Sequence, residues 1–351
     1  MNSRSKVVAV SLAAPTASAP ASRSPASTRE ALPPELAHLA EGSFGEALAK
    51  AVDLAQYTLA PRTAQAYEGY WSAFQAWCEG HAAPSLPAPP AIVAAYLAER
   101  SATLGRSGLR LILAAIAHHH RRAGQPWTSR DPVIGSVMRG ILRQQQRPAR
   151  PAAALTSAEV KRLLDACGGD LAGTRDRALF LLGFAGALRR SELVAVDREH
   201  LRFTPEGLVL TIPHSKRDQE GQGASLGIPR GLNPLTCPVR AMEEWLRRSR
   251  IPYGAVFRRL SSRGALEGRL TGNGVWRILR RRAEIAGISV EEGERLSPHG
   301  LRAGFITEAY LKGALDEQVM HHTRQKSLAT TQGYRRRARI TRDSPARLLD
   351  L

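Results

Sequence analysis

The chain has 351 residues, more than one domain usually holds, so we expect about two domains, each with its own core. Its 50 Lys and Arg residues outnumber its 31 Asp and Glu residues, and the formal net charge of +19 favours a polyanionic partner such as nucleic acid. Three widely spaced cysteines argue against a disulfide framework and against a zinc site, and no apolar run reaches the roughly 20 residues of a membrane helix. We therefore expect a cytoplasmic protein that does not span a membrane, although a ribosomal or membrane-surface protein would share this charge.

Residues 1–41 are rich in Ala, Ser and Pro and are predicted to form a disordered tail. The start looks like a weak secretory signal, with Arg4 and Lys6 before an apolar run, but that run is at the short limit for such a signal. The first acidic residue is Glu30, so an organellar transit peptide is the open alternative.

Residues 42–146 are predicted to form an all-α domain of short helices. Helices are expected to begin near Thr63, at Pro89 and Pro90, at Gly105, and at Pro132 after an Asp131 cap. The helix over 105–124 ends in three adjacent histidines, 118–120, which point in different directions and cannot converge on one metal ion. We interpret them as a polar or phosphate-facing helix end.

Residues 147–154, RPARPAAA, lack apolar periodicity and are predicted to be the interdomain linker. In the domain that follows, 155–351, an apolar helix is expected over 175–188. The pattern then alternates with a period of two over 208–212 and 224–228, which predicts an antiparallel hairpin. The rest is expected to be helical, so the second domain is predicted to be mainly α with a small antiparallel β-sheet, an α+β fold.

The second domain carries chemically distinctive residues in a defined order. They are Arg189 in GALRRSELVAV, Lys216 in the polar hairpin turn, His299 and Arg302 in SPHGLRAGFIT, and Tyr334 in ATTQGYRRRAR. His299 and Arg302 are three residues apart, so on a helix they share one face. Glu192 follows Arg189 closely and is interpreted as structural, accepting hydrogen bonds that hold the arginine junction. In so basic a chain one arginine alone indicates little, and the interpretation depends on the joint order.

This order resembles that of the tyrosine recombinase, or phage integrase, family, over roughly residues 45–345. The resemblance implies a SAM-like, core-binding N-terminal domain and the α+β catalytic domain of these enzymes. It also implies a site-specific DNA recombinase that cuts and rejoins DNA through a 3′-phosphotyrosine intermediate, without a metal ion or another cofactor.

The resemblance assigns a role to each of these residues. Arg189 and Arg302 clamp the scissile phosphate, because a guanidinium presents paired donors and keeps its charge. Tyr334 is the nucleophile and His299 is its base, since phenolate is scarce at neutral pH. Lys216 protonates the departing 5′ oxygen.

One position departs from the family pattern. The family has His or Trp nine residues before the nucleophile, as a donor to the phosphate, whereas this chain has Gln325. An amide nitrogen can also donate, so Gln325 is predicted to take this role, with His322 as the alternative. Replacing the donor by another donor is expected to slow cleavage less than losing it would.

The resemblance further implies double-stranded DNA as the partner and a homotetramer on paired DNA sites. A short helix predicted from Ser344 onward, with Leu348 and Leu349, is expected to dock into a neighbouring subunit rather than onto its own domain. Accessory DNA-bending or directionality factors, and association with the nucleoid, are further expectations. Two alternatives are open: a type IB topoisomerase-like nicking and closing enzyme, and a DNA-binding protein without catalysis, for which Gln325 is the support.

Overall fold

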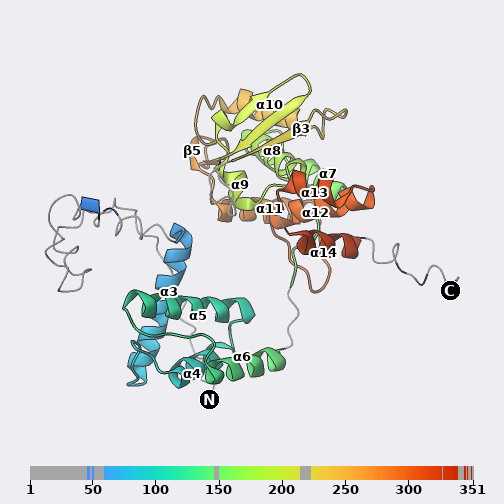
Figure 1. The fold of residues 1–351 in the computed structure, drawn as a ribbon. Coiled ribbons are helices and arrows are strands. Elements are labelled where there is room, and N and C mark those ends of the chain that lie inside the picture. The colour runs from blue at the N-terminus through green and yellow to red at the C-terminus, as the bar shows by residue number, and fades with distance from the viewer. Residues whose placement is uncertain are drawn as a thin grey trace, which may run out of the picture. The chain divides into compact units, whose positions relative to one another are not determined.

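The computed structural model contains two compact units, residues 1–147 and 148–351, each built around its own hydrophobic core (Figure 1). The structure describes residues 46–47, 50, 59–145, 150–213, 223–325, 327–338, 344, 346 and 349. Within these ranges no helix is both long enough and apolar enough to cross a membrane.

The first unit is helical, as predicted. Its helices are α3 (Pro61–Gly80), α4 (Pro90–Arg100), α5 (Arg106–Arg122) and α6 (Pro132–Gln145). Helix α3 packs against α5, and α4 packs against α6. Proline is the first residue of three of these helices. It lacks a backbone N–H, but an N–H at this position has no acceptor within the helix, so proline is tolerated there. The predicted Asp131 cap is confirmed, because its carboxylate accepts from the Val133 N–H at 2.9 Å.

The interpretation of the three histidines as a phosphate-facing helix end is wrong for His119 and His120. His120 is fully buried, accepting from the Ala88 N–H at 2.8 Å through Nε2, while its Nδ1 lies 2.9 Å from the Ile116 carbonyl oxygen. His119 stacks on Trp71 with ring centroids 4.6 Å apart. The core accepts His120 because backbone groups satisfy both of its ring nitrogens.

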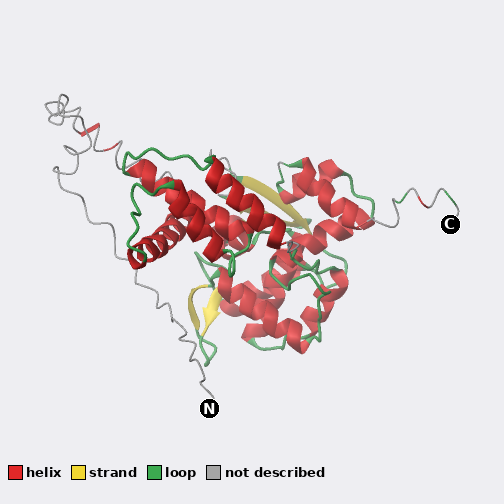
Figure 2. Cartoon of the chain, turned by 90° about the horizontal axis from the view of Figure 1, so that it is seen from below, coloured by secondary structure: helices red, strands yellow, loops and turns green. Residues whose placement is uncertain are grey.

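The second unit is mainly helical with two small antiparallel sheets (Figure 2). Its elements are α7 (Ser157–Asp165), α8 (Leu171–Ala185), α9 (Arg190–Ala195), the 3₁₀ turn η2 (Arg198–His200), β1 (Leu201–Phe203), β2 (Gly207–Ile212), β3 (Ala224–Pro229), α10 (Pro238–Ser249), β4 (Arg258–Leu260), β5 (Leu266–Arg269), α11 (Gly272–Ile285), α12 (His299–Leu311), α13 (Asp316–Thr323) and α14 (Leu328–Ala338).

The predicted hairpin is confirmed as β2 and β3, with Leu210 opposite Leu226 and both side chains buried. Strand β1 adds to the other edge of β2, and β4 pairs with β5 in a separate sheet. None of these three additional strands was predicted, because three or four residues are too few to establish a period of two.

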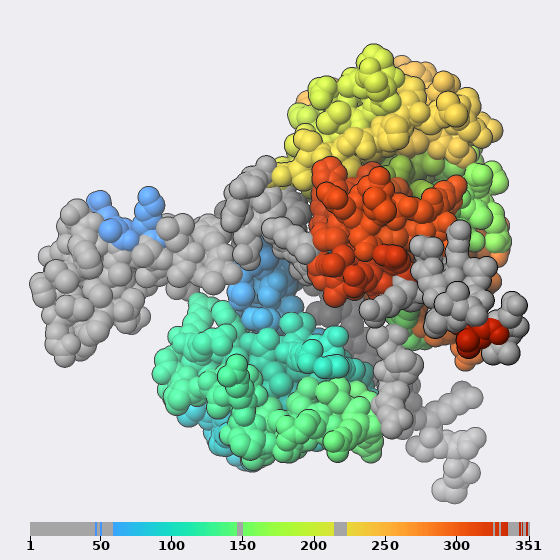
Figure 3. Space-filling view, turned by 45° about the vertical axis from the view of Figure 1, so that its right-hand side comes forward, coloured from blue at the N-terminus to red at the C-terminus, as the bar shows by residue number. Residues whose placement is uncertain are grey.

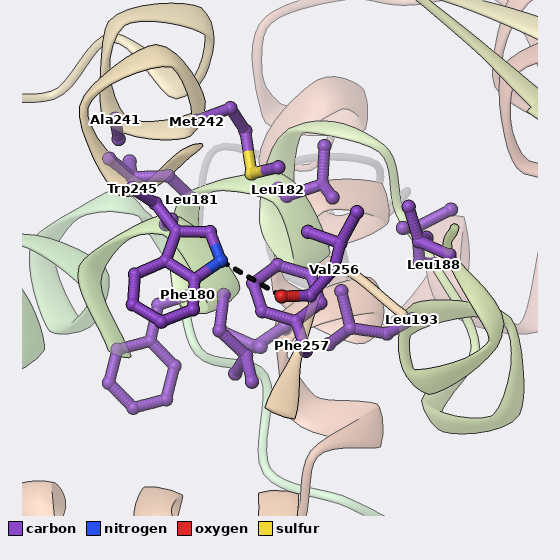
Figure 4. Packing of buried hydrophobic residues seen from close by; sticks show 14 of the residues in the cluster. Phe180, Leu181, Leu182, Leu188, Leu193, Ala241, Met242, Trp245, Val256 and Phe257 are labelled. Carbon is purple, nitrogen blue, oxygen red and sulfur yellow. Dashed lines mark hydrogen bonds between the residues drawn. The ribbon is translucent and has the colours of Figure 1, made fainter. Parts of the chain in front are cut away.

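Helix α8 lies at the centre of the second unit. It packs against α10, α7 and α12, so most of its residues are buried and none is exposed, and its sequence LFLLGFA is apolar on every face. Figure 4 shows Phe180 and Leu182 of this helix beside Trp245 of α10. The indole Nε1 of Trp245 donates to the Val256 carbonyl at 3.0 Å, which satisfies the one polar atom of this buried side chain.

The chain before α7 lies directly against α12. Ala152, in the stretch predicted to be a linker, forms a parallel bridge with Arg295, and the Leu155 N–H donates to the Gly300 carbonyl at 3.0 Å. A Cβ on Gly304 would lie only 1.7 Å from the Leu155 carbonyl oxygen. Glycine therefore allows the close approach that fixes the position of α12.

We predict that Gly304→Ala lowers the free energy of unfolding by about 1–3 kcal/mol, because the new methyl group cannot fit against the Leu155 backbone. Gly140→Ala is the matched control, since a Cβ there has open space and should stabilise α6 by about 0.5–1 kcal/mol. Urea unfolding followed by circular dichroism measures both. Equal effects of the two substitutions would contradict this account of α12.

Candidate active site

Arg189 lies at the sharp junction between α8 and α9. Ala187 has a left-handed backbone, with φ 43°, and the chain turns there so that Arg189 becomes the N-cap of α9. The Arg189 N–H donates to Glu192 Oε2 at 2.9 Å, and its guanidinium Nη1 donates to Glu192 Oε1. The structural role predicted for Glu192 is confirmed by these contacts. Helix α9 begins at Arg190, so Ser191 lies inside its first turn.

Glu192 is a buried carboxylate, only 5% exposed. Burial alone would raise its pKa, but the Arg189 N–H and the charges of Arg324 and Arg189 outweigh burial and lower the pKa. Glu192 is therefore ionised at neutral pH and holds Arg189 by both its backbone and its side chain.

Arg302 is the most deeply buried cation of the site, 2% exposed. Its guanidinium donates from Nη1 to the Ala187 carbonyl and from Nη2 to the Thr323 carbonyl, each at 2.6 Å. Burial, with the nearby charge of Arg189, lowers the pKa of Arg302 to about 10, so the side chain is still protonated at pH 7. Arg302 thus connects the junction before α9 to the end of α13.

His299 and Tyr334 meet beside these arginines. Nε2 of His299, the first residue of α12, lies 3.2 Å from the hydroxyl oxygen of Tyr334 in α14. Although His299 keeps an exposed surface, partial loss of water around its ring lowers its pKa, and the charges of Arg302 and Arg189 lower it further. A neutral imidazole is favoured at pH 7, and a neutral imidazole can accept a proton from a phenol.

The aromatic ring of Tyr334 is half-buried, and its packing helps to hold α14 in place. The ring lies against a small apolar cluster of the same unit, made by Ile306, Tyr310 and Val319. On the face drawn in Figure 3, α12, α13 and α14 (orange to red) form one continuous surface. Helix α12 carries His299 and Arg302, and α14 carries Tyr334.

Gln325 lies in the turn between α13 and α14. Its backbone N–H donates to the Met320 carbonyl at 3.1 Å, and its Oε1 accepts from the hydroxyls of Thr323 at 3.2 Å and Thr331 at 3.1 Å. These contacts hold the side-chain amide of Gln325 in the turn.

Comparison with known proteins identifies the family. Residues 153–339, more than half of the chain, match the phage integrase family. The chain belongs to this family. It is a tyrosine-type site-specific DNA recombinase, as the order of its motifs implied.

The relatives extend over most of the recombinase. The integrase/recombinase xerD homolog of Selenomonas ruminantium is 31% identical over 290 residues, 81% of this chain and 84% of that protein. Among solved structures, the Tn1549 transposon integrase with transposon right end DNA gives a TM-score of 0.55 at 15% identity, covering 81% of this chain and 94% of that one. A lambda integrase tetramer bound to a Holliday junction gives 0.53 at 19% identity, covering 80% and 74%. These structures show that the fold is shared, which confirms the α+β fold class.

Five of the predicted site residues of this recombinase lie together: Arg189, His299, Arg302, Gln325 and Tyr334. Lys216 falls in 214–222, outside the described residues, so its role stays a prediction. His322, the alternative to Gln325, has its Nε2 2.7 Å from the Ala185 carbonyl oxygen and stacks on Phe305 with centroids 4.6 Å apart. These contacts hold the ring against α8 and α12.

Three residues around Gln325 have contacts that the motif analysis missed. Arg324 donates from Nη2 to Glu192 Oε2 at 3.0 Å, and the hydroxyls of Thr323 and Thr331 contact the Gln325 amide. The only signal in the sequence was their proximity to a position that departs from the family pattern. Among the described residues, no group of three or more His, Cys, Asp or Glu side chains is placed to hold a metal ion.

Proposed function

We propose that the recombinase cuts double-stranded DNA through attack of Tyr334 on the scissile phosphate, forming a 3′-phosphotyrosine bond. The observation that carries this proposal is the 3.2 Å contact between His299 Nε2 and the Tyr334 hydroxyl, beside two arginines. His299 takes the phenol proton as the Tyr334 oxygen bonds to phosphorus, and the bond from phosphorus to the 5′ oxygen breaks. A free 5′ hydroxyl can then reverse the reaction and rejoin a strand.

Arg189 and Arg302 are the proposed phosphate clamp. Negative charge builds on the nonbridging oxygens in the transition state, and guanidiniums held in advance stabilise it without reorganising. Arg302 is held by two backbone carbonyls and Arg189 by Glu192, so both are preorganised. Lys216 is the proposed acid for the departing 5′ oxygen.

Gln325 is proposed to donate its amide N–H to a nonbridging oxygen, where the family has His or Trp. The two threonine contacts support this role because they hold the amide in the turn beside Arg324. An amide carries no charge, so it stabilises the transition state less than a protonated histidine would.

The proposed assembly is a homotetramer on paired DNA sites, with strands exchanged through a Holliday junction and C-terminal tails exchanged between subunits. The lambda integrase tetramer on a Holliday junction supports this arrangement by analogy of fold. The net charge of +19 supports an extended contact with duplex DNA. Accessory DNA-bending or directionality factors and association with the nucleoid are part of the same proposal.

A DNA-binding protein without catalysis is the second candidate, because Gln325 replaces the usual donor. The assembled pair of His299 and Tyr334 favours the catalytic function instead. A topoisomerase-like enzyme would use the same chemistry within one site, and tail exchange would distinguish the recombinase from it.

We predict that the intact chain forms a covalent adduct with a suicide DNA duplex taken from the flanks of its own gene, and that Tyr334→Phe abolishes it. After cleavage the duplex releases a short fragment that carries the free 5′ hydroxyl, so rejoining is prevented and the adduct accumulates on a denaturing gel. Tyr253→Phe is the matched control and should retain the adduct, because Tyr253 is 75% exposed and outside the site. Tight binding without an adduct would instead favour the binding-only function.

The lowered pKa of His299 predicts how cleavage depends on pH. A base must be unprotonated, so the rate should be flat near pH 7–8 and fall in acid, with a midpoint below the ordinary histidine value of about 6.5. Measurement at DNA concentrations below Kd reports the free protein. His299→Gln should remove this acid limb and slow cleavage by roughly 100-fold or more.

The exposed His81 provides the control, since His81→Gln should leave the acid limb in place. An unchanged limb in His299→Gln would show that another group is the base.

A further inference from the structure

Glu192 is shared between two arginines. Its Oε1 accepts from Arg189, and its Oε2 accepts from Arg324 Nη2 at 3.0 Å as well as from the Arg189 backbone N–H. The side chains of Glu192 and Arg324 are only 3% and 11% exposed, so water screens this ion pair poorly. A change in the charge of Arg324 is therefore felt across the whole cluster.

The shared carboxylate creates an electrostatic conflict in a site for an anion. Arg189 and Arg302 bring two positive charges to the phosphate, but the ionised Glu192 beside Arg189 cancels one of them. Arg324 restores the second positive charge, and it does so without releasing Arg189 from the carboxylate. The charges of Arg189 and Arg324 also help to lower the pKa of Arg302.

The backbone at Arg324 makes the choice of arginine notable. Arg324 caps α13 with a left-handed conformation, φ 55° and ψ 43°, where glycine is free of strain and other residues are not. Within the described part of the chain its buried Nε has no hydrogen-bond partner. A strained residue with an incompletely bonded charged side chain is a sign of function rather than of stability.

We infer that Arg324 is a positioning residue of the active site, which neutralises Glu192 and so leaves the charge of Arg189 available to the scissile phosphate. It also holds the turn that presents Gln325 to the same phosphate. The inference depends on the proposed function, since it concerns the transition state of DNA cleavage. The inference concerns the balance of charge between Glu192, Arg324 and Arg189. This balance can be tested separately from the packing of the turn.

The test is Arg324→Gly, measured as the single-turnover rate of adduct formation on the suicide duplex and as the Kd for the same DNA. Glycine relieves the left-handed backbone while it removes the charge. We expect the rate to fall on the order of 10-fold or more, with Kd changed less than about threefold, because the effect is on transition-state charge. Arg324→Lys keeps the charge and should recover part of the rate. If the glycine variant fails to fold, the rate of the lysine variant is measured in its place.

Arg250→Gly is the matched control. Arg250 caps α10 in the same left-handed conformation, φ 52°, but it is exposed and outside the Glu192 cluster, so its substitution should leave the rate unchanged. Glu192→Gln supplies the second arm, because the carboxylate charge is then absent. In that background Arg324→Gly should slow the reaction by less than about threefold.

The outcomes distinguish a failure of the inference about Arg324 from a failure of the proposed function. An Arg324→Gly protein that forms adduct at the unaltered rate would overturn the inference and leave the proposed function intact. An equal loss with and without the Glu192 carboxylate would also overturn it, since the role would then be structural. Absence of an adduct with the unaltered chain would overturn the proposed function and the inference together.

Discussion

The buried guanidinium of Arg302 is the interaction on which the rest of the site depends. It lies in α12 and donates to one carbonyl in the junction between α8 and α9 and to another at the end of α13. Removing a cation from water costs several kcal/mol, which only well-aligned hydrogen bonds offset. The acceptors are backbone atoms, so the hydrogen bonds fix the path of the chain at the junction and at the end of α13. The segments that carry Arg189 and Gln325 are therefore placed by the same side chain that is proposed to bind the phosphate.

Concentrating positive charge in this way has two consequences for the chemistry. It adds to the effect of burial, which is the larger cause, in lowering the pKa of His299, and so favours the neutral imidazole that a base requires. It also requires a buried anion to hold the cations in place, and Glu192 fills that role. The site proposed to receive a phosphate thus contains a carboxylate, and the charge of Arg324 is inferred to compensate for it. Holding Arg189 in place requires an ionised Glu192, whereas binding a phosphate disfavours a negative charge there. Pairing Glu192 with both Arg189 and Arg324 meets both requirements.

Much of this organisation could be predicted from the sequence where local rules are strong. Prolines at first turns indicated the starts of α4 and α6, and the alternation in 208–212 and 224–228 indicated the β2 and β3 hairpin. The order of Arg189, His299, Arg302 and Tyr334 indicated the family because residues distant in the chain share one reaction.

The features that sequence analysis missed depend on tertiary contacts. Strands β1, β4 and β5 are too short to show periodicity, and the burial of His120 depends on the Ala88 N–H, far away in the sequence. The ion pair of Arg324 could not be predicted, because its partner, Glu192, lies 132 residues earlier in the chain. Lys216 lies outside the described residues and stays a prediction.

The central claim is that Tyr334 makes the covalent bond to DNA, and its most direct test is peptide mapping of the trapped complex. The adduct is digested with a protease and a nuclease, and mass spectrometry locates the residual nucleotide. The account predicts a nucleotide joined through its 3′ phosphate to the Tyr334 oxygen, and a free 5′ hydroxyl on the released strand. A nucleotide on another residue, or a protein bond to a 5′ phosphate, would contradict it.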